Sequence, residues 1–270
     1  MSSGSEPASH EGGRLLLDEP APGVARLSIS NPGKRGALDH AILDSFAEWM
    51  PKLDARCVIV TGVEETFSAG YDIGNFPERA LGSEAERLVA HPFTAAIEAV
   101  EAYPFPTLAA LNGPAIGGGL ELALACDLRI AARGVAFAMP PGKLGLVYSH
   151  TGIRKFIEVV GATRTRELFL AGRRIDADTA LSWGLVGALA DRDRLADLAS
   201  EWAKEIAANA PLAQRGNKRV IDSVVRAAGQ LDAATERELI ELREACFESE
   251  DFREGVRAFG EKRAPRWRGR

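Results

Sequence analysis

The sequence predicts an α/β fold in which strands and helices alternate in the first half of the chain and helices fill most of the second. Short runs rich in β-branched and aliphatic residues recur between segments whose apolar residues have helical spacing. From Thr151 onward the pattern is almost wholly helical. Alternation of this kind implies a layered architecture with crossover connections. The 270 residues can bury a core as one large domain or as two smaller ones.

The elements of the first half are short and separated by turns. Each predicted strand is a compact apolar run, and each predicted helix repeats apolar residues about three or four positions apart. The strands are Val24 to Ser30, Arg56 to Gly62, Pro106 to Gly113 and Asp127 to Ala132. The helices are Ala37 to Met50 and roughly Glu84 to Ala102.

The carboxyl third is predicted to be a layer of helices. The segment "DADTALSWGLV" begins at an aspartate cap and ends at Gly184, which suits a C-cap glycine. The helices that follow are Arg192 to Ala208, Pro211 to Ala228, Leu231 to Phe247 and Phe252 to Lys262. Within the first of them, Leu198, Trp202 and Ile206 form an apolar stripe that must be buried on the core or on another subunit.

Composition excludes several classes of protein. Hydrophobic residues at 46% and charged residues at 26% are near the averages of folded globular proteins. A net charge of −5 argues against general affinity for DNA, although the last nine residues, "KRAPRWRGR", are basic. Cys57, Cys126 and Cys246 lack metal-ligand spacing, so we expect reduced thiols and no metal site.

The first 13 residues are small and polar, and we expect a flexible terminus at residues 1–13. They have no apolar core of the kind that a secretory signal needs and few arginines. No later run is long and apolar enough to span a bilayer. We therefore expect a cytoplasmic protein that does not bind membranes.

The stretch "IGGGLELALACD" places one carboxylate, Glu121, in an apolar segment behind three glycines. Glycines allow positive φ and close approach of a ligand, and a helix that starts after them presents unpaired N–H groups. The segment is apolar on nearly every side, which predicts burial, and a buried carboxylate is costly unless it is neutralised or used. Glu121 is therefore a candidate acid/base. The alternative is a first-turn acid that complements the helix dipole, although such acids usually face water.

A second glycine turn, "TFSAGYDIGNF", follows the predicted strand that ends near Thr61. Two such turns at strand ends, each offering a backbone N–H, could bind one oxygen together. If that oxygen belongs to a thioester carbonyl, the paired donors stabilise the enolate that forms when charge moves onto it.

These motifs resemble the enoyl-CoA hydratase/isomerase (crotonase) superfamily. "TFSAGYDI" is similar to its first oxyanion turn and "LNGPAIGGGLELALACDLRIA" to its second turn and catalytic helix. "AGRRIDADTALSWGLV" and "FREGVRAFGEKRAPRW" are similar to its later segments. The resemblance implies a crotonase-like ββα spiral core at residues 14–205 and, at 206–270, a helical C-terminal region for trimerisation and capping of coenzyme A. Trimers or dimers of trimers are expected from it.

The resemblance also implies roles for single residues. The backbone N–H groups of Tyr71 and Gly118 would form the oxyanion hole, and Glu121 matches the first of the family's two catalytic glutamates. The substrate would be an acyl-coenzyme A thioester, with no permanently bound cofactor. The implied coenzyme A contacts are Arg35, Ala69, Phe259 and Lys262, of which the last two would reach a neighbouring subunit's ligand.

The chain departs from the family pattern at the second glutamate, which Pro141 replaces in "FAMPPGKLGLVYSHTG". Hydration of an enoyl thioester needs a proton delivered at one carbon while water is activated at the next, and two acid/base groups do this better than one. We therefore expect a hydratase/isomerase family enzyme that works through a thioester enolate with Glu121 as its single acid/base.

Two alternatives stay open. The same stretch is similar to the methylmalonyl-CoA decarboxylase branch, which has a tyrosine at the place of Tyr148. Loss of carbon dioxide itself forms the enolate, so Tyr148 could orient the leaving carboxylate or return a proton, unless it is only a buried aromatic. Tyr71 counts against this branch, which has a histidine there; His150 is a further candidate acid, and Lys143 has no assigned direction. The other alternative is a non-catalytic member that binds acyl-CoA or RNA, which the basic tail would suit.

Overall fold

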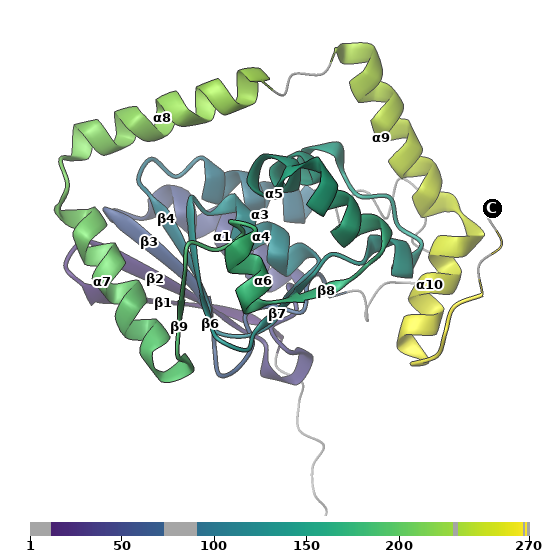
Figure 1. The fold of residues 1–270 in the computed structure, drawn as a ribbon, viewed down its shortest axis with the longest axis horizontal. Helices are drawn as coiled ribbons and strands as arrows, with labels where there is room; N and C mark the ends of the chain where they lie inside the picture. Colours follow the sequence, from purple (N-terminus) through teal and green to yellow (C-terminus); the bar gives the residue numbers. More distant parts are fainter. Residues whose placement is uncertain (1–11, 73–90, 229–231, 267, 269–270) are drawn as a thin grey trace, which may run out of the picture.

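The computed structural model describes residues 12–72, 91–228, 232–266 and 268, and these form two sheets with helices packed around them (Figure 1). Within the described residues, the larger sheet has six strands in the order β1-β2-β3-β4-β6-β9, and the smaller has three in the order β5-β7-β8. β1 pairs antiparallel with β2, and the remaining neighbours of the larger sheet pair in parallel. The strands are β1 (Arg14–Ala21), β2 (Val24–Ser30), β3 (Cys57–Gly62), β4 (Thr107–Leu111), β5 (Ala115–Ile116), β6 (Leu128–Ala132), β7 (Ala136–Ala138), β8 (Arg174–Asp176) and β9 (Ala188–Ala190).

Helices fill the connections and form the whole carboxyl-terminal part. They are α1 (His40–Trp49), α3 (His91–Glu101), α4 (Gly118–Ala125), α5 (His150–Leu170), α6 (Ala177–Ser182), α7 (Leu195–Ala208), α8 (Pro211–Ala228), α9 (Ala233–Glu248) and α10 (Glu250–Gly260). Short 3-10 turns lie at η1 (Pro32–Lys34), η2 (Met50–Lys52), η5 (Pro141–Leu144) and η6 (Arg192–Arg194).

The predicted strands are confirmed as β2, β3, β4 and β6, but the sequence did not predict the other strands. β1 is an edge strand with mostly exposed residues, including Asp18 and Glu19, so its apolar pattern is weak. β5, β7, β8 and β9 have two or three residues each, too few to show a period. β8 and β9 also correct the expectation that the chain is almost wholly helical after Thr151.

The helices need smaller corrections. α6 is confirmed, with the Asp176 side chain accepting the N–H of Thr179 and Gly184 at φ +74° beyond its end. The helix predicted from Arg192 begins instead with η6, and α7 follows from Leu195. Of the helix predicted from roughly Glu84, residues 84–90 lie outside the described residues, and α3 covers the rest.

We predicted a flexible terminus at residues 1–13, of which residues 1–11 lie outside the described residues. Gly13 is buried, and its N–H donates to Asp39 Oδ2 at 2.6 Å. A side chain there would meet Ile42 Cδ1 at 2.5 Å and Asp39 Oδ2 at 2.7 Å. Gly13 therefore belongs to the packed part of the protein, contrary to the prediction, because this glycine lets the chain pass close to α1.

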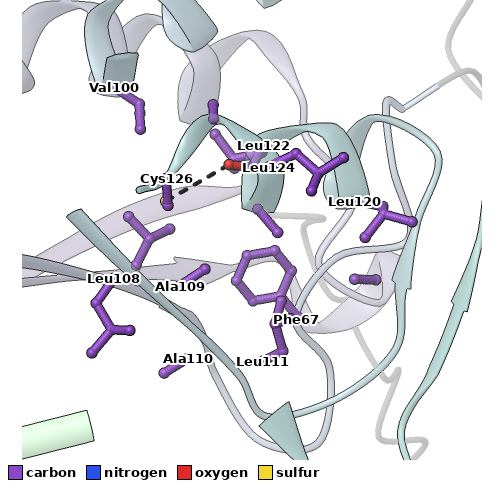
Figure 2. Close-up of a cluster of buried hydrophobic side chains, with 14 of the residues drawn as sticks. Phe67, Val100, Leu108, Ala109, Ala110, Leu111, Leu120, Leu122, Leu124 and Cys126 are labelled. Carbon is purple, nitrogen blue, oxygen red and sulfur yellow. Dashed lines mark hydrogen bonds between the residues drawn. The ribbon is translucent and has the colours of Figure 1, made fainter. Parts of the chain in front are cut away.

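α4 lies in the middle of the core. Figure 2 shows Phe67 between this helix and the β4 residues Leu108 to Leu111. Every residue of α4 from Gly119 to Ala125 is buried. The burial predicted from the apolar sequence of this helix is confirmed, and α3 and α5 pack against it.

The outer helical layer begins after α7. α7 packs across the large sheet against β3, β4 and β6, and its stripe of Leu198, Trp202 and Ile206 is half-buried on that core. The domain boundary predicted after residue 205 falls inside this helix, so the outer layer begins with α8. α8 is an outer helix whose Lys218 pairs with Asp127, just before β6, at 2.7 Å. α9 and α10 lie on the other side of the molecule (Figure 1).

Candidate active site

Two backbone turns bring Tyr71 and Gly118 side by side. The turns are joined by backbone hydrogen bonds from Ser68 N to Pro114 O and from Ile116 N to Ser68 O, at 3.1 and 3.0 Å. A methyl group on Gly118 would lie 3.5 Å from the backbone nitrogen of Tyr71. Gly118 is the first residue of α4, and the first N–H groups of a helix have no acceptor within it.

Glycine is required where these two turns touch. Gly70 has φ +98°, and a side chain on it would meet the carbonyl oxygen of Ile116 at 2.8 Å. Gly117 has φ +54° and caps α4, and a side chain on Gly119 would meet Ser68 Cβ at 2.5 Å. Larger residues would push the turns apart, which is the physical reason for the glycine run. The helix begins inside that run, at Gly118, and not after it.

Glu121 is 4% exposed although it lies in the first turn of α4. Glu121 therefore does not face water, as a first-turn acid that only complements the helix dipole usually does. Its Oε2 accepts a short hydrogen bond from the hydroxyl of Tyr148, which precedes α5. Burial raises the pKa of Tyr148 well above its usual value of 10, and the charge of Glu121 and this hydrogen bond raise it further. The phenol therefore stays protonated and acts as the donor.

The Glu121–Tyr148 pair is held by its surroundings. The ring of Tyr148 packs edge-on against Phe169, with centroids 5.6 Å apart. Gly152, in the first turn of α5, supplies the space: a side chain on it would meet Tyr148 Cε1 at 2.7 Å and Glu121 Oε1 at 2.8 Å. Ser149 caps that turn by accepting the Gly152 N–H at 3.0 Å. The sequence contained no signal that Gly152 belongs to the site.

The sequence also singled out Pro141, Lys143 and His150, which lie close to Tyr148 along the chain. Pro141 is buried in η5 and has no titratable group. Lys143 is exposed and lies against Gly172, where a side chain would meet its Cε at 2.9 Å. His150 Nε2 lies 3.3 Å from Glu236 Oε1 of α9.

Tyr71 has a partner that the sequence did not indicate. Its hydroxyl lies 3.3 Å from Nε2 of His40, the first residue of α1, and the two rings meet edge-on. Burial, and then the charge of Asp72, raise the pKa of Tyr71 to about 12. A histidine thus approaches this tyrosine from a distant element, and nothing in the sequence spacing links the two.

The candidate coenzyme A contacts fall into two groups. Ala69 N donates to Arg35 O at 3.0 Å, so these two lie together beside the Tyr71 turn, with Arg35 exposed. Phe259, 52% exposed, and Lys262, exposed, lie at the end of α10, which packs on η5. The basic tail beyond Lys262 folds back on α10, where Arg263 pairs with Glu254 at 2.6 Å.

Within the described part of the chain, no group of three or more His, Cys, Asp and Glu side chains could hold a metal ion. No helix in that part is long and apolar enough to cross a membrane. Cys57 and Cys126 are buried free thiols, and burial raises the pKa of each to about 12. The side chain of Cys246 lies outside the described residues.

Comparison with known proteins shows what the chain is similar to. Residues 19–270 match the family model for enoyl-CoA hydratase/isomerase. A probable enoyl-CoA hydratase of Mycobacterium leprae is 32% identical over 265 residues, which cover 92% of this chain and 97% of the relative. A solved methylmalonyl-CoA decarboxylase in complex with 2-nitronate-propionyl-CoA has a TM-score of 0.86 at 26% identity, covering 95% of this chain and 99% of its own. A solved enoyl-CoA hydratase/isomerase from Pseudoalteromonas atlantica has a TM-score of 0.82 at 29% identity, covering 94% of this chain and 99% of its own.

Proposed function

This chain belongs to the enoyl-CoA hydratase/isomerase family, and we propose that it is an acyl-CoA enzyme acting through a thioester enolate, with the Glu121–Tyr148 pair as its acid/base group. The observation that carries the proposal is the hydrogen bond from the Tyr148 hydroxyl to the buried Glu121 carboxylate. The turns of Tyr71 and Gly118 lie beside the start of the helix that bears Glu121. We infer that the substrate is a coenzyme A thioester and that no permanent cofactor is needed.

The two turns would hold the thioester carbonyl oxygen. Backbone N–H donors fixed by glycines and by turn-to-turn hydrogen bonds need no reorganisation when charge develops on that oxygen. Such preorganised donors favour the enolate over the uncharged carbonyl form of the bound thioester, because the enolate oxygen carries more negative charge. Catalysis then needs a group that moves a proton to or from the adjacent carbon.

Glu121 is suited to that step. A carboxylate can take the proton from the carbon beside the thioester carbonyl, leaving the electron pair in the enolate, and can return the same proton to the substrate. One carboxylate suffices for such a transfer from carbon to carbon. Tyr148 keeps its own proton at neutral pH, so it fixes the carboxylate and offers a second proton-bearing group. The pair thereby compensates in part for Pro141, which cannot transfer protons.

Decarboxylation is a second candidate, favoured by the likeness to a solved methylmalonyl-CoA decarboxylase with a TM-score of 0.86. In that reaction the bond to the carboxylate breaks, its electron pair enters the enolate, carbon dioxide leaves, and a proton is then added to the carbon. The oxyanion turns would serve both reactions. The buried Glu121 carboxylate is suited to proton transfer but would repel a substrate carboxylate placed next to it, so we rank decarboxylation second.

The exposed apolar side of α8 supports the proposal of a homotrimer or dimer of trimers. Val220, Ile221, Val224 and Val225, which lie on one side of this helix, are 61%, 61%, 65% and 38% exposed. Several large apolar side chains so exposed on one helix are typical of a subunit interface. The cytoplasmic location remains a prediction.

Mass spectrometry in heavy water tests the chemistry. Purified protein is incubated with crotonyl-CoA and methylmalonyl-CoA together, and the molecular masses of the products are measured. Deuterium incorporation or addition of water to crotonyl-CoA, without loss of carbon dioxide, is the expected result. Release of carbon dioxide with deuterium gained would establish the decarboxylase, and no change in either thioester would contradict both candidates.

A further inference from the structure

The segment that carries Tyr148 is enclosed on two sides. Toward the core, the Tyr148 ring packs on Phe169 and its hydroxyl bonds Glu121. On the other side, η5 packs against α10, and α5 packs against α9. The carboxyl-terminal helix pair therefore packs against the segment that follows Pro141 in the same chain. Figure 1 shows α9 and α10 to the side of α5.

One close approach is between Gly255 of α10 and Leu144 of η5. A side chain on Gly255 would meet the Leu144 carbonyl, with the carbonyl carbon at 2.6 Å and Cα at 3.1 Å. Both are backbone atoms and cannot rotate away, so only glycine allows the helix to lie this close. The contact fixes the backbone four residues before Tyr148.

A small apolar cluster makes the second contact. Phe247 of α9 and Phe252 of α10 are each 5% exposed, and their rings meet edge-on with centroids 5.1 Å apart. Leu146 packs against them. This cluster is separate from the main core, so the helix pair has its own apolar attachment to the segment, two residues before Tyr148.

The third contact lies on the other side of the tyrosine. His150 Nε2 is 3.3 Å from Glu236 Oε1, and the His150 side chain is 19% exposed. The helix pair thus holds positions 144, 146 and 150, which bracket Tyr148 along the chain.

We propose that α9 and α10 position Tyr148 against Glu121 from their own chain, with Gly255 and Glu236 as positioning residues. Because Tyr148 precedes α5 in an irregular segment, its ring direction depends on what lies behind that segment as well as on Phe169. Loosening the outer contacts lets the hydroxyl move away from the carboxylate. The consequence for turnover rests on the proposed function, but the placement of Tyr148 does not.

Tyrosine NMR reads that placement directly. The chain has three tyrosines, so labelling their Cζ carbons gives a spectrum in which Tyr148→Phe identifies the Tyr148 resonance. Gly255→Ala should shift this resonance and leave that of Tyr103, which bonds the Ala55 carbonyl, in place. Gly260→Ala is the matched control in the same helix, because a side chain there meets no atom within 4 Å.

Glu236→Gln provides a second variant that keeps the fold, since Glu236 is half exposed, and Glu244→Gln is its exposed control on α9. We expect Glu236→Gln to shift the Tyr148 resonance and Gly255→Ala to lower kcat about tenfold or more, with a smaller change in KM. An unmoved Tyr148 resonance in both variants, or in Glu236→Gln alone should Gly255→Ala not fold, would overturn the proposal. A shifted resonance in an enzyme whose Tyr148→Phe variant turns over normally would leave the positioning intact and refute the catalytic role of Tyr148.

Discussion

The hydroxyl of Tyr148 donates a hydrogen bond to the buried carboxylate of Glu121, joining residues 27 positions apart in the sequence. Replacing either residue changes the buried polar partner of the other. The relationship therefore yields separate predictions for each residue and for the space around them.

Glu121→Gln should leave acyl-CoA binding intact and lower kcat about a hundredfold or more, because the amide keeps the shape and hydrogen-bonding capacity of the side chain but cannot exchange protons at neutral pH. Calorimetric binding and steady-state kinetics on the substrate found by mass spectrometry measure the two effects. Glu201→Gln, at an exposed position of α7, is the control. Unchanged turnover in Glu121→Gln would remove the acid/base role of this residue.

Tyr148→Phe should change how stability depends on alkaline pH. The folded pKa of Tyr148 is raised above its usual value of 10, so the wild-type protein keeps this stabilisation below pH 10 and loses it as pH rises toward the folded pKa. Tyr148→Phe has no hydroxyl to ionise at this position, so its stability does not fall for this reason. Unfolding by urea near about pH 8 and about pH 11 should show the wild-type free energy of unfolding falling further than that of the variant. Parallel declines would mean that Tyr148 is not shielded as the structure shows.

Gly152→Ala should impair turnover without preventing folding. The new methyl group would press on Tyr148 Cε1 and Glu121 Oε1, at 2.7 and 2.8 Å, and both are side-chain atoms that can move aside. Displacement of the pair by a fraction of an ångström should lower kcat about tenfold or more. Gly260→Ala again serves as control, with circular dichroism to follow folding. Full activity in Gly152→Ala would show that the geometry of the pair is not critical.

Val224→Asp should dissociate the assembly. Val224 is 65% exposed on α8, and a charge there cannot be buried in an apolar interface without a large desolvation cost. Light scattering should give a multiple of the 28.9 kDa chain mass for the wild type and a lower mass for the variant. Ser223→Asp, one residue away on the same helix, is the control. Equal masses for wild type and Val224→Asp would place the interface elsewhere.

Local patterns in the sequence determined a large part of this protein. The apolar runs of β2, β3, β4 and β6, the capped helix α6 and the burial of Glu121 follow from neighbouring residues, because strand and helix periods and capping act over a few positions. The glycine turns and Tyr148 were recognisable for the same reason, helped by their resemblance to a family. Pro141, by the same resemblance, predicted that a second acid/base glutamate is missing.

Only the tertiary structure decided which of these groups meet. It joined Tyr148 to Glu121, directed His150 to Glu236, brought His40 to Tyr71, and left Lys143 at the surface. The two- and three-residue strands also form only because distant segments pair with them. These contacts depend on the path of the whole chain and on space left by glycines such as Gly152 and Gly255. The local spacing of apolar residues predicts neither the path nor the space.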